Sequence, residues 1–225
     1  MRPWELLDTA VVPGDRNELR LYRRGDEFSI KAGHCELMNS RVHGSEDALA
    51  ELACQRLTHR PQAHILIGGL GMGFTLSAAL KQLGPEARVT IAELVPDVIK
   101  WNRGLLAELA GAPLNDPRVQ VHEGDVGQLI RSQANTYDAV LLDVDNGPEG
   151  LTRKENDALY SPSGLKSAMT TLTVGGIFGV WSISPDQRFS KRLQTTGFKV
   201  DEVRARARGR SGGGRHMIWL GKKLR

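Results

Sequence analysis

The sequence of 225 residues is poor in the residue types that build disulfide frameworks, metal centres and membrane spans. Its two cysteines, Cys35 and Cys54, show neither a CxxC pattern nor a zinc-type histidine spacing, and we expect both to be small buried side chains. No apolar run approaches the roughly 18 residues that a transmembrane helix needs, so no membrane partner is expected. The N-terminus lacks the apolar core of a signal peptide, which favours a cytoplasmic protein.

The rest of the composition is that of an ordinary soluble domain, with 40% hydrophobic and 25% charged residues. The net charge is +4, and the excess gathers around Arg204, Arg206, Arg208, Arg210 and Arg215. A basic segment can bind nucleic acid, but the period-two alternation of KVDEVRARARGR is typical of a strand with one solvated face. We therefore do not expect a nucleic-acid partner. A non-catalytic nucleotide-binding module that contacts nucleic acid through this segment stays an alternative.

The first sixty residues differ in pattern from the rest of the chain. Short strands are predicted near residues 18–23 and 27–32, on either side of a turn at 24–26. A helix is predicted over residues 45–57, with Ser45 as its N-cap and acidic residues in its first turn. Residues 1–60 are thus a small β-hairpin region plus a helix.

After Pro61, strands and helices alternate. Strands are predicted at residues 64–69, 88–94, 118–124, 137–144 and 175–181, and then at 198–206 and 216–221. Helices are predicted at residues 75–83, 96–109, 126–132 and 163–172. Alternation at this spacing predicts an α/β fold with a doubly wound, mostly parallel sheet, a Rossmann-like domain over residues 61–225.

Three glycines, Gly69, Gly71 and Gly73, follow the first of these strands and precede a helix. Glycine at this point lets the backbone turn sharply and lets a nucleotide approach without obstruction by a Cβ atom. The pattern is weak alone, and the ends of the following strands strengthen it.

Acidic residues end the next three strands. Glu93 stands where a carboxylate can accept the ribose hydroxyls of a nucleotide. Asp125 can face an adenine amino group, although the N-cap of a helix starting at Val126 explains it nearly as well. Asp143 and Asp145 follow the fourth strand. Because ligands of open α/β sheets bind outside the carboxyl ends of the strands, these residues predict one crevice.

From about residue 64 to residue 181 the chain resembles the spermidine synthase family. The fold that this resemblance implies is the S-adenosylmethionine methyltransferase sheet with a small N-terminal β-region. The run from Asp116 through Gly150 is the most persuasive part. The matching stretches are ILIGGLGMGFTLSAALK, TIAELVPDVIKWNR, DPRVQVHEGDVGQLI, YDAVLLDVDNGPEG and LYSPSGLKSAMTTLTVGGIFGVW.

The resemblance implies transfer of an aminopropyl group from decarboxylated S-adenosylmethionine to an amine, as in polyamine biosynthesis. Asp143 matches the aspartate that deprotonates or orients the attacking amine, with Asp145 beside it. The loop 146–150 could close over the site. We assign the adenosyl site to Gly69, Gly71, Gly73, Glu93, Leu94, Asp125 and Val126.

The sequence departs from the family's pattern on the side of the aminopropyl group and the acceptor. Leu70 replaces an aspartate of the glycine loop, and Asn146 replaces a second loop acid. Glu36 and Glu46 are the best matches to a glutamine and a Tyr-His-Glu cluster, while His43 is expected to be a polar surface residue. Trp181, at a strand end, could line an acceptor pocket.

These departures make methyl transfer from S-adenosylmethionine to a small molecule the alternative function, because without an acid at position 70 the carboxylated donor meets less repulsion. The run VLLDVDNG faintly resembles metal-dependent O-methyltransferases, but no second acid-plus-amide pair completes such a site, so no metal is expected. The family resemblance also implies a possible homodimer.

Overall fold

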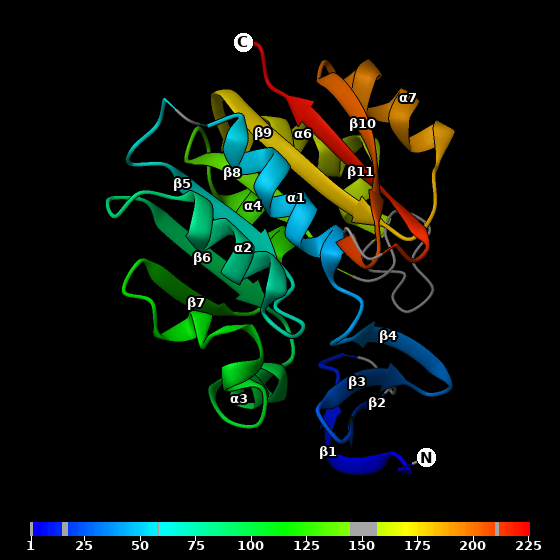
Figure 1. Ribbon diagram of the computed structural model, residues 1–225. Coiled ribbons are helices and arrows are strands. Elements are labelled where there is room, and N and C mark those ends of the chain that lie inside the picture. Colours follow the sequence, from blue (N-terminus) through cyan, green and yellow to red (C-terminus); the bar gives the residue numbers. More distant parts are fainter. Residues whose placement is uncertain (1, 15–17, 58, 145–156, 210–211) are drawn as a thin grey trace.

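The structure, a computed structural model, describes residues 2–14, 18–57, 59–144, 157–209 and 212–225 (Figure 1). Its larger sheet has seven strands in the order β10-β11-β9-β8-β5-β6-β7. Strands β5 to β9 run parallel, and the β10–β11 hairpin joins the edge of β9 antiparallel. The strands are β5 (His64–Gly68), β6 (Arg88–Glu93), β7 (Val119–Glu123), β8 (Tyr137–Leu142), β9 (Leu172–Ser182), β10 (Lys199–Arg206) and β11 (Arg215–Lys222).

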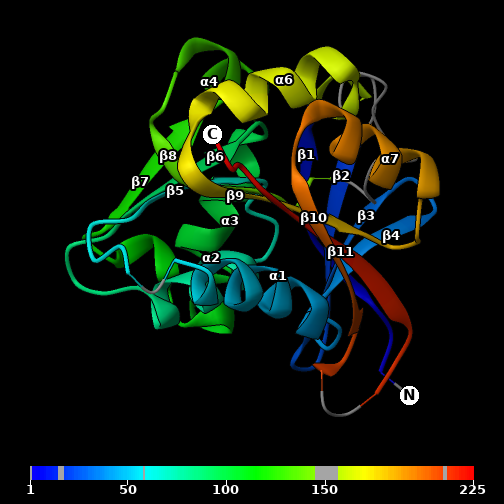
Figure 2. The same ribbon diagram turned by 90° about the horizontal axis from the view of Figure 1, so that it is seen from above.

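Helices cover both faces of this sheet (Figure 2), so its central strands are buried on both sides. One apolar cluster packs under the first three helices and the other under α4, α6 and α7. The longer helices are α1 (Gly44–Gln55), α2 (Phe74–Gln82), α3 (Pro96–Arg103), α4 (Val126–Ser132), α6 (Pro162–Thr171) and α7 (Gln187–Thr196). The short ones are α5 (Asp157–Tyr160), η1 (Ala107–Ala110) and η2 (Pro113–Asn115).

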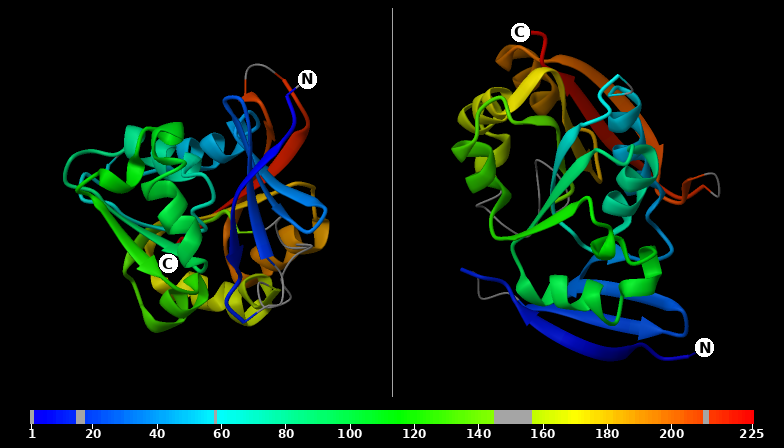
Figure 3. Two further views of the ribbon diagram at one scale, coloured as in Figure 1. Left: turned by 90° about the horizontal axis from the view of Figure 1, so that it is seen from below. Right: turned by 90° about the vertical axis from the view of Figure 1, so that its left-hand side faces the viewer.

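A smaller antiparallel sheet precedes α1, in the order β1-β2-β3-β4. It lies across one end of the larger sheet, beside α3 (Figure 3), where the Trp101 indole donates to Asp8 Oδ2 at 2.9 Å. Its strands are β1 (Glu5–Val11), β2 (Glu18–Arg24), β3 (Glu27–Ala32) and β4 (Cys35–Asn39). The two middle strands match the prediction, but β1 and β4 carry no clear alternation of buried and exposed residues and were not predicted.

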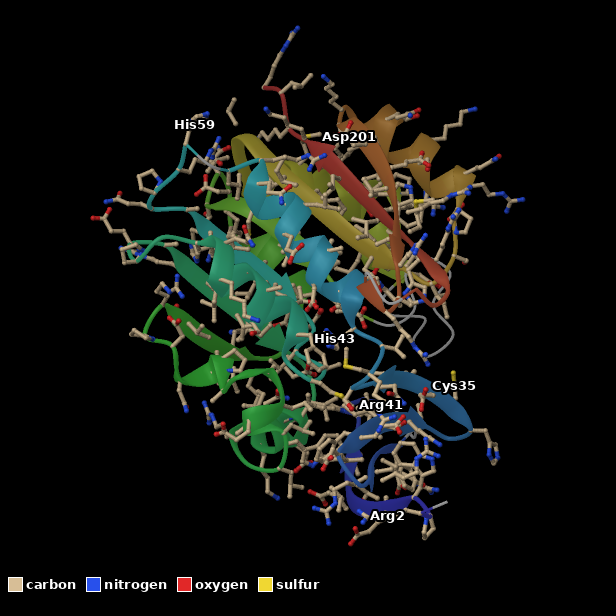
Figure 4. All side chains as sticks on the ribbon, in the orientation of Figure 1. Arg2, Cys35, Arg41, His43, His59 and Asp201 are labelled. Atoms are coloured by element: carbon tan, nitrogen blue, oxygen red, sulfur yellow. The ribbon has the colours of Figure 1, made fainter. Side chains whose placement is uncertain are left out.

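Three local predictions were wrong. The helix predicted over residues 96–109 ends at Arg103, because Gly104 leaves the helical conformation and only a 3₁₀ turn follows. His43 rather than Ser45 occupies the N-cap position of α1, and the Ser45 side chain turns inward. Cys54 is buried as expected, but Cys35 lies half-exposed at the outer edge of the smaller sheet (Figure 4).

The described part of the chain contains no helix that is both long and apolar enough to span a bilayer. The division of the chain at residue 60 stays a prediction.

Candidate active site

A cavity lies between the carboxyl ends of β5, β6 and β8 and the smaller sheet. Its walls have three parts. The glycine-loop half comprises Gly69, Gly71, Glu93, Leu94, Asp125 and Val126. The acidic half comprises Glu46, Asp143 and Trp181. The smaller sheet adds an apolar wall made by Val12, Leu19, Ile30, Ala32, Leu37 and Met38.

The glycine loop needs glycine at two positions that line the cavity. At Gly69 φ is +89° and an added Cβ would lie 2.4 Å from the Asp143 carbonyl oxygen. At Gly71 φ is +52° and a Cβ would lie 2.9 Å from Met38 Sδ. Any larger residue would be both strained and crowded at either position. The Met72 N–H also donates to Met38 Sδ at 3.1 Å, which ties the loop to β4.

Gly73, the third predicted glycine, does not line this cavity. It has φ of +84° at the N-cap of α2, and a Cβ there would meet Asn102 and Pro113. Its role in the structure is to start the helix. Leu70 also lies outside the cavity lining, since its side chain is buried in the core.

Glu93 ends β6 with its side chain buried. The Leu70 N–H donates to Glu93 Oε2 at 2.8 Å, and the Val95 N–H donates to Oε1 at 2.9 Å. Desolvation raises the pKa of this carboxyl, and the backbone N–H groups oppose that rise. Because each carboxylate oxygen has a second acceptor position, Glu93 can hold the glycine loop and still accept a ribose hydroxyl.

Asp125 serves as the N-cap of α4, as the simpler interpretation of the sequence predicted. Its carboxylate accepts from the Gly127 N–H at 2.8 Å, while Arg131 lies 3.4 Å away. Asp125 also lines the cavity together with Leu94 and Val126. The capping role therefore fixes the carboxylate at the wall of the cavity.

The acidic half brings together two carboxyl groups from distant parts of the chain. Asp143 follows β8 and accepts a hydrogen bond of 2.5 Å from the Thr75 hydroxyl at the start of α2. Glu46, from the first turn of α1, is 5% exposed and accepts from the Ser45 hydroxyl at 2.6 Å. Among the residues that the structure describes, neither carboxyl forms an ion pair.

Burial dominates the electrostatics of this pair. Desolvation raises the pKa of Asp143 to about 6, opposed by the Thr75 hydrogen bond and assisted by the charge of Asp47. Desolvation raises the pKa of Glu46 to about 8, and the neighbouring Asp143 charge adds to that rise. Burial and mutual repulsion therefore disfavour the state in which both carboxyls are ionised, unless a cation enters the cavity.

Trp181 supplies the aromatic wall of the acidic half. Its indole Nε1 is buried and has no hydrogen-bond partner among the described residues. The ring meets His216 edge-on, with the ring centroids 4.9 Å apart. A buried N–H donor without a partner is rare in proteins.

The remaining predicted site residues lie elsewhere. Glu36 stays on the smaller sheet, where it accepts from Ser29 at 2.7 Å, and does not line the cavity. His43 stacks on Phe74 and bonds Asp47 at 2.8 Å, which raises the pKa of its imidazole. Asp145, Asn146 and the loop 146–150 lie outside the described residues.

Sequence reasoning missed the apolar wall from the smaller sheet and several residues that hold the site together, among them Thr75, Met38, Ser45 and His216. Thr75 could have been found, because it stands directly after the glycine loop. Met38, Ser45 and His216 carry no local signal, since their roles depend on contacts between elements far apart in the chain.

These features define an α/β protein of the methyltransferase-like type, with a glycine loop and acidic strand ends facing one cavity. Residues 46–189 match the model of the spermine/spermidine synthase domain, and the chain belongs to that family.

The similar proteins agree with this assignment. A polyamine aminopropyltransferase of Prochlorococcus marinus (strain MIT 9215) is 29% identical over 126 residues, which cover 56% of this chain and 42% of that relative. The spermidine synthase from Thermotoga maritima superposes with a TM-score of 0.77 at 16% identity, over 97% of this chain and 72% of that one. The O-methyltransferase TomG from Streptomyces achromogenes has a TM-score of 0.56 at 18% identity, over 80% of each chain. At these identities the structural matches speak for the fold alone.

Proposed function

We propose that the protein transfers an aminopropyl group from decarboxylated S-adenosylmethionine to an amine. The observation that carries this proposal is the pair Glu46 and Asp143, two carboxyls in one cavity without a basic partner among the described residues. Family membership supports it further.

An ammonium group is the ligand that such a pair favours. Two desolvated carboxylates repel each other, and a cation placed between them lowers the pKa of both. Trp181 adds an aromatic face, which also favours a cation or its alkyl chain. The acidic half is thus suited to an aliphatic amine.

The glycine-loop half is suited to the adenosyl part of the donor. Glu93 would accept the ribose hydroxyls and Asp125 the adenine amino group, with Gly69 and Gly71 leaving room for the backbone to approach. This arrangement would place the sulfonium at the boundary between the halves, near Asp143.

The reaction then needs one base and good alignment. The Asp143 carboxylate takes a proton from the acceptor ammonium, and the freed nitrogen lone pair forms a bond to the aminopropyl carbon attached to the sulfonium sulfur. The carbon–sulfur bond breaks, and its electron pair stays on sulfur to give neutral methylthioadenosine. Because the sulfonium is an activated leaving group, alignment supplies much of the remaining acceleration.

The test is incubation with decarboxylated S-adenosylmethionine and a series of α,ω-diamines, followed by mass spectrometry. The proposal expects methylthioadenosine and an N-aminopropyl product in equal amounts, and at least about 10²-fold slower formation of both with Asp143→Asn. Glu51→Gln, an exposed acid on the same helix as Glu46, is the matched control and should keep full turnover. Absence of both products with every diamine would refute the proposal.

Methyl transfer is the second candidate, favoured by one observation. Leu70 replaces the acid of the family's glycine loop, and its side chain is buried in the core, so this position offers no carboxylate to the donor tail. Substituting S-adenosylmethionine in the same assay tests it, with a methylated amine and S-adenosylhomocysteine as products. A homodimer and a cytoplasmic location also stay proposals.

A further inference from the structure

The hydroxyl of Ser45 lies between an acid of the cavity and a histidine on another element. Ser45 Oγ is 2.6 Å from Glu46 Oε2 and 2.8 Å from His216 Nδ1. Ser45 is fully buried at the start of α1, whereas His216, in β11, is half-buried. A continuous chain of hydrogen bonds therefore leads from the acidic half of the cavity to a residue with access to solvent.

A hydroxyl has one hydrogen, so Ser45 can donate to only one of these partners at a time. When Glu46 is ionised, Ser45 donates to its carboxylate and accepts from an Nδ1–H of His216. When Glu46 is protonated, its hydroxyl donates to Ser45 and Ser45 donates to a bare Nδ1. The protonation of Glu46 thus selects the tautomer of neutral His216.

We propose that Glu46, Ser45 and His216 form a proton path that carries the proton released by the acceptor out of the acidic half. The source of that proton rests on the proposed function, but the path itself is a property of the three side chains. Among the described residues, no other side-chain hydrogen bond of Glu46 leads to a half-exposed titratable group.

Each transfer along the path balances. The proton on Glu46 Oε2 moves to Ser45 Oγ while the hydrogen of Ser45 moves to His216 Nδ1, which leaves a carboxylate, an intact hydroxyl and an imidazolium. The imidazolium then releases its Nε2 proton to solvent and becomes the Nδ1–H tautomer. This is the arrangement that goes with an ionised Glu46, and the next transfer first needs the imidazole to return to the Nε2–H tautomer by proton exchange with solvent.

The surrounding charges place the resting proton on Glu46. Glu46 faces Asp143 at the end of β8, with Asp47 and His43 on its own helix. Since Glu46 has the higher pKa of the two carboxyls, a proton released in the acidic half settles on it. Burial lowers the pKa of His216, so its imidazole is neutral at rest, and the imidazolium formed by an uphill transfer from Glu46 persists only until its Nε2 proton leaves. His216 packs against the uncharged Trp181 ring.

The test is nitrogen-15 NMR of the histidine side chains between pH 6 and pH 9.5, on the full chain. The proposal expects His216 to change from the Nε2–H to the Nδ1–H tautomer as Glu46 ionises near pH 8. Glu46→Gln and Ser45→Ala should each abolish the change. His64 is the internal control, because its Nε2 lies 3.0 Å from the Thr90 hydroxyl with no acid beyond it.

A tautomer that stays constant in the natural protein, or that still changes in Ser45→Ala, would overturn the path. If Ser45→Ala does not fold, Glu46→Gln decides the same question. Turnover gives the second readout: His216→Ala should lower kcat at least about tenfold, with unchanged affinity for methylthioadenosine and recovery on adding imidazole. A tautomer change in a protein that turns over no amine would refute the proposed function and leave the path standing.

Discussion

The two halves of the cavity are built in different ways. The glycine-loop half is made of backbone turns and of acids, Glu93 and Asp125, whose carboxylates already hold local N–H groups. The acidic half is made of the side chains of Glu46 in α1, Asp143 after β8 and Trp181 in β9. Its two carboxyls accept hydrogen bonds from hydroxyl groups and form no ion pair among the described residues.

This difference separates binding from chemistry. A surface fixed by its own backbone hydrogen bonds costs little to organise and suits a constant part of a ligand, which in the proposed function is the adenosyl group. Carboxyls with pKa values near neutrality suit a group that must gain and lose protons. The experiments below damage one half at a time and ask whether the other is affected.

The largest expected effect is in the acidic half. Asp143→Asn removes the proposed base that follows β8 but keeps the shape of the side chain and the acceptor oxygen facing Thr75. We expect kcat with an amine to fall about 10²- to 10⁴-fold, while the calorimetric affinity for methylthioadenosine stays unchanged. Normal turnover would show that Asp143 is not the base.

Gly69→Ala attacks the glycine-loop half. The positive φ costs about 1–2 kcal/mol for a side chain, and the contact with the Asp143 carbonyl adds to it. We expect a loss of about 2 kcal/mol or more in the free energy of unfolding, with loss of methylthioadenosine binding. Gly111→Ala is the control, because φ is +79° there and no atom lies within 4 Å of the added Cβ. Equal losses in the two variants would show that the contact with Asp143 is unimportant.

Glu46→Gln tests the acidic half through the pH dependence of the protein's stability. Its pKa in the folded protein, about 8, is above the ordinary value of 4.5, so the folded state binds this proton more tightly. The resulting stability is complete below pH 4.5 and is lost as the pH rises through 8.

Glutamine does not ionise, so the stability of the Glu46→Gln variant does not fall as the pH rises through 8. We expect its Tm to exceed that of the natural protein increasingly from pH 6 to pH 9, by at least about 2–4 °C at the upper end, as for about 1 kcal/mol. Glu51→Gln should show a constant difference. A constant difference for Glu46→Gln as well would mean that the carboxyl is not desolvated.

Trp181→Phe gives the smallest effect. It removes an indole N–H that has no partner among the described residues while keeping an aromatic wall. We expect KM for the amine to rise about two- to tenfold, as for one hydrogen bond, with unchanged methylthioadenosine affinity. Trp219→Phe, which breaks a core hydrogen bond of 2.8 Å to Ser190, should instead lower stability alone. A loss of stability in Trp181→Phe with an unchanged KM for the amine would show that Trp181 does not belong to the acceptor site.

The same contrast explains what the sequence could predict. The parallel strands and the glycine-loop half follow from local patterns: apolar runs, glycines and an acid at each strand end. The strands β1 and β4 escaped prediction because neither shows a clear alternation and neither flanks a recognised turn signal, whereas β2 and β3 lie on either side of the turn at 24–26. The contacts of Ser45 with His216, and of Met38 with the glycine loop, join distant segments and depend on packing that no local pattern encodes.

The most direct measurement is calorimetric titration of the protein with S-adenosylmethionine, its decarboxylated form and methylthioadenosine, side by side. The account predicts that methylthioadenosine and the decarboxylated donor bind more tightly than the carboxylated donor, because the acidic half repels a carboxylate and attracts an amine. Tighter binding of S-adenosylmethionine would contradict aminopropyl transfer and support methyl transfer, and binding of none of the three would contradict the adenosyl site itself.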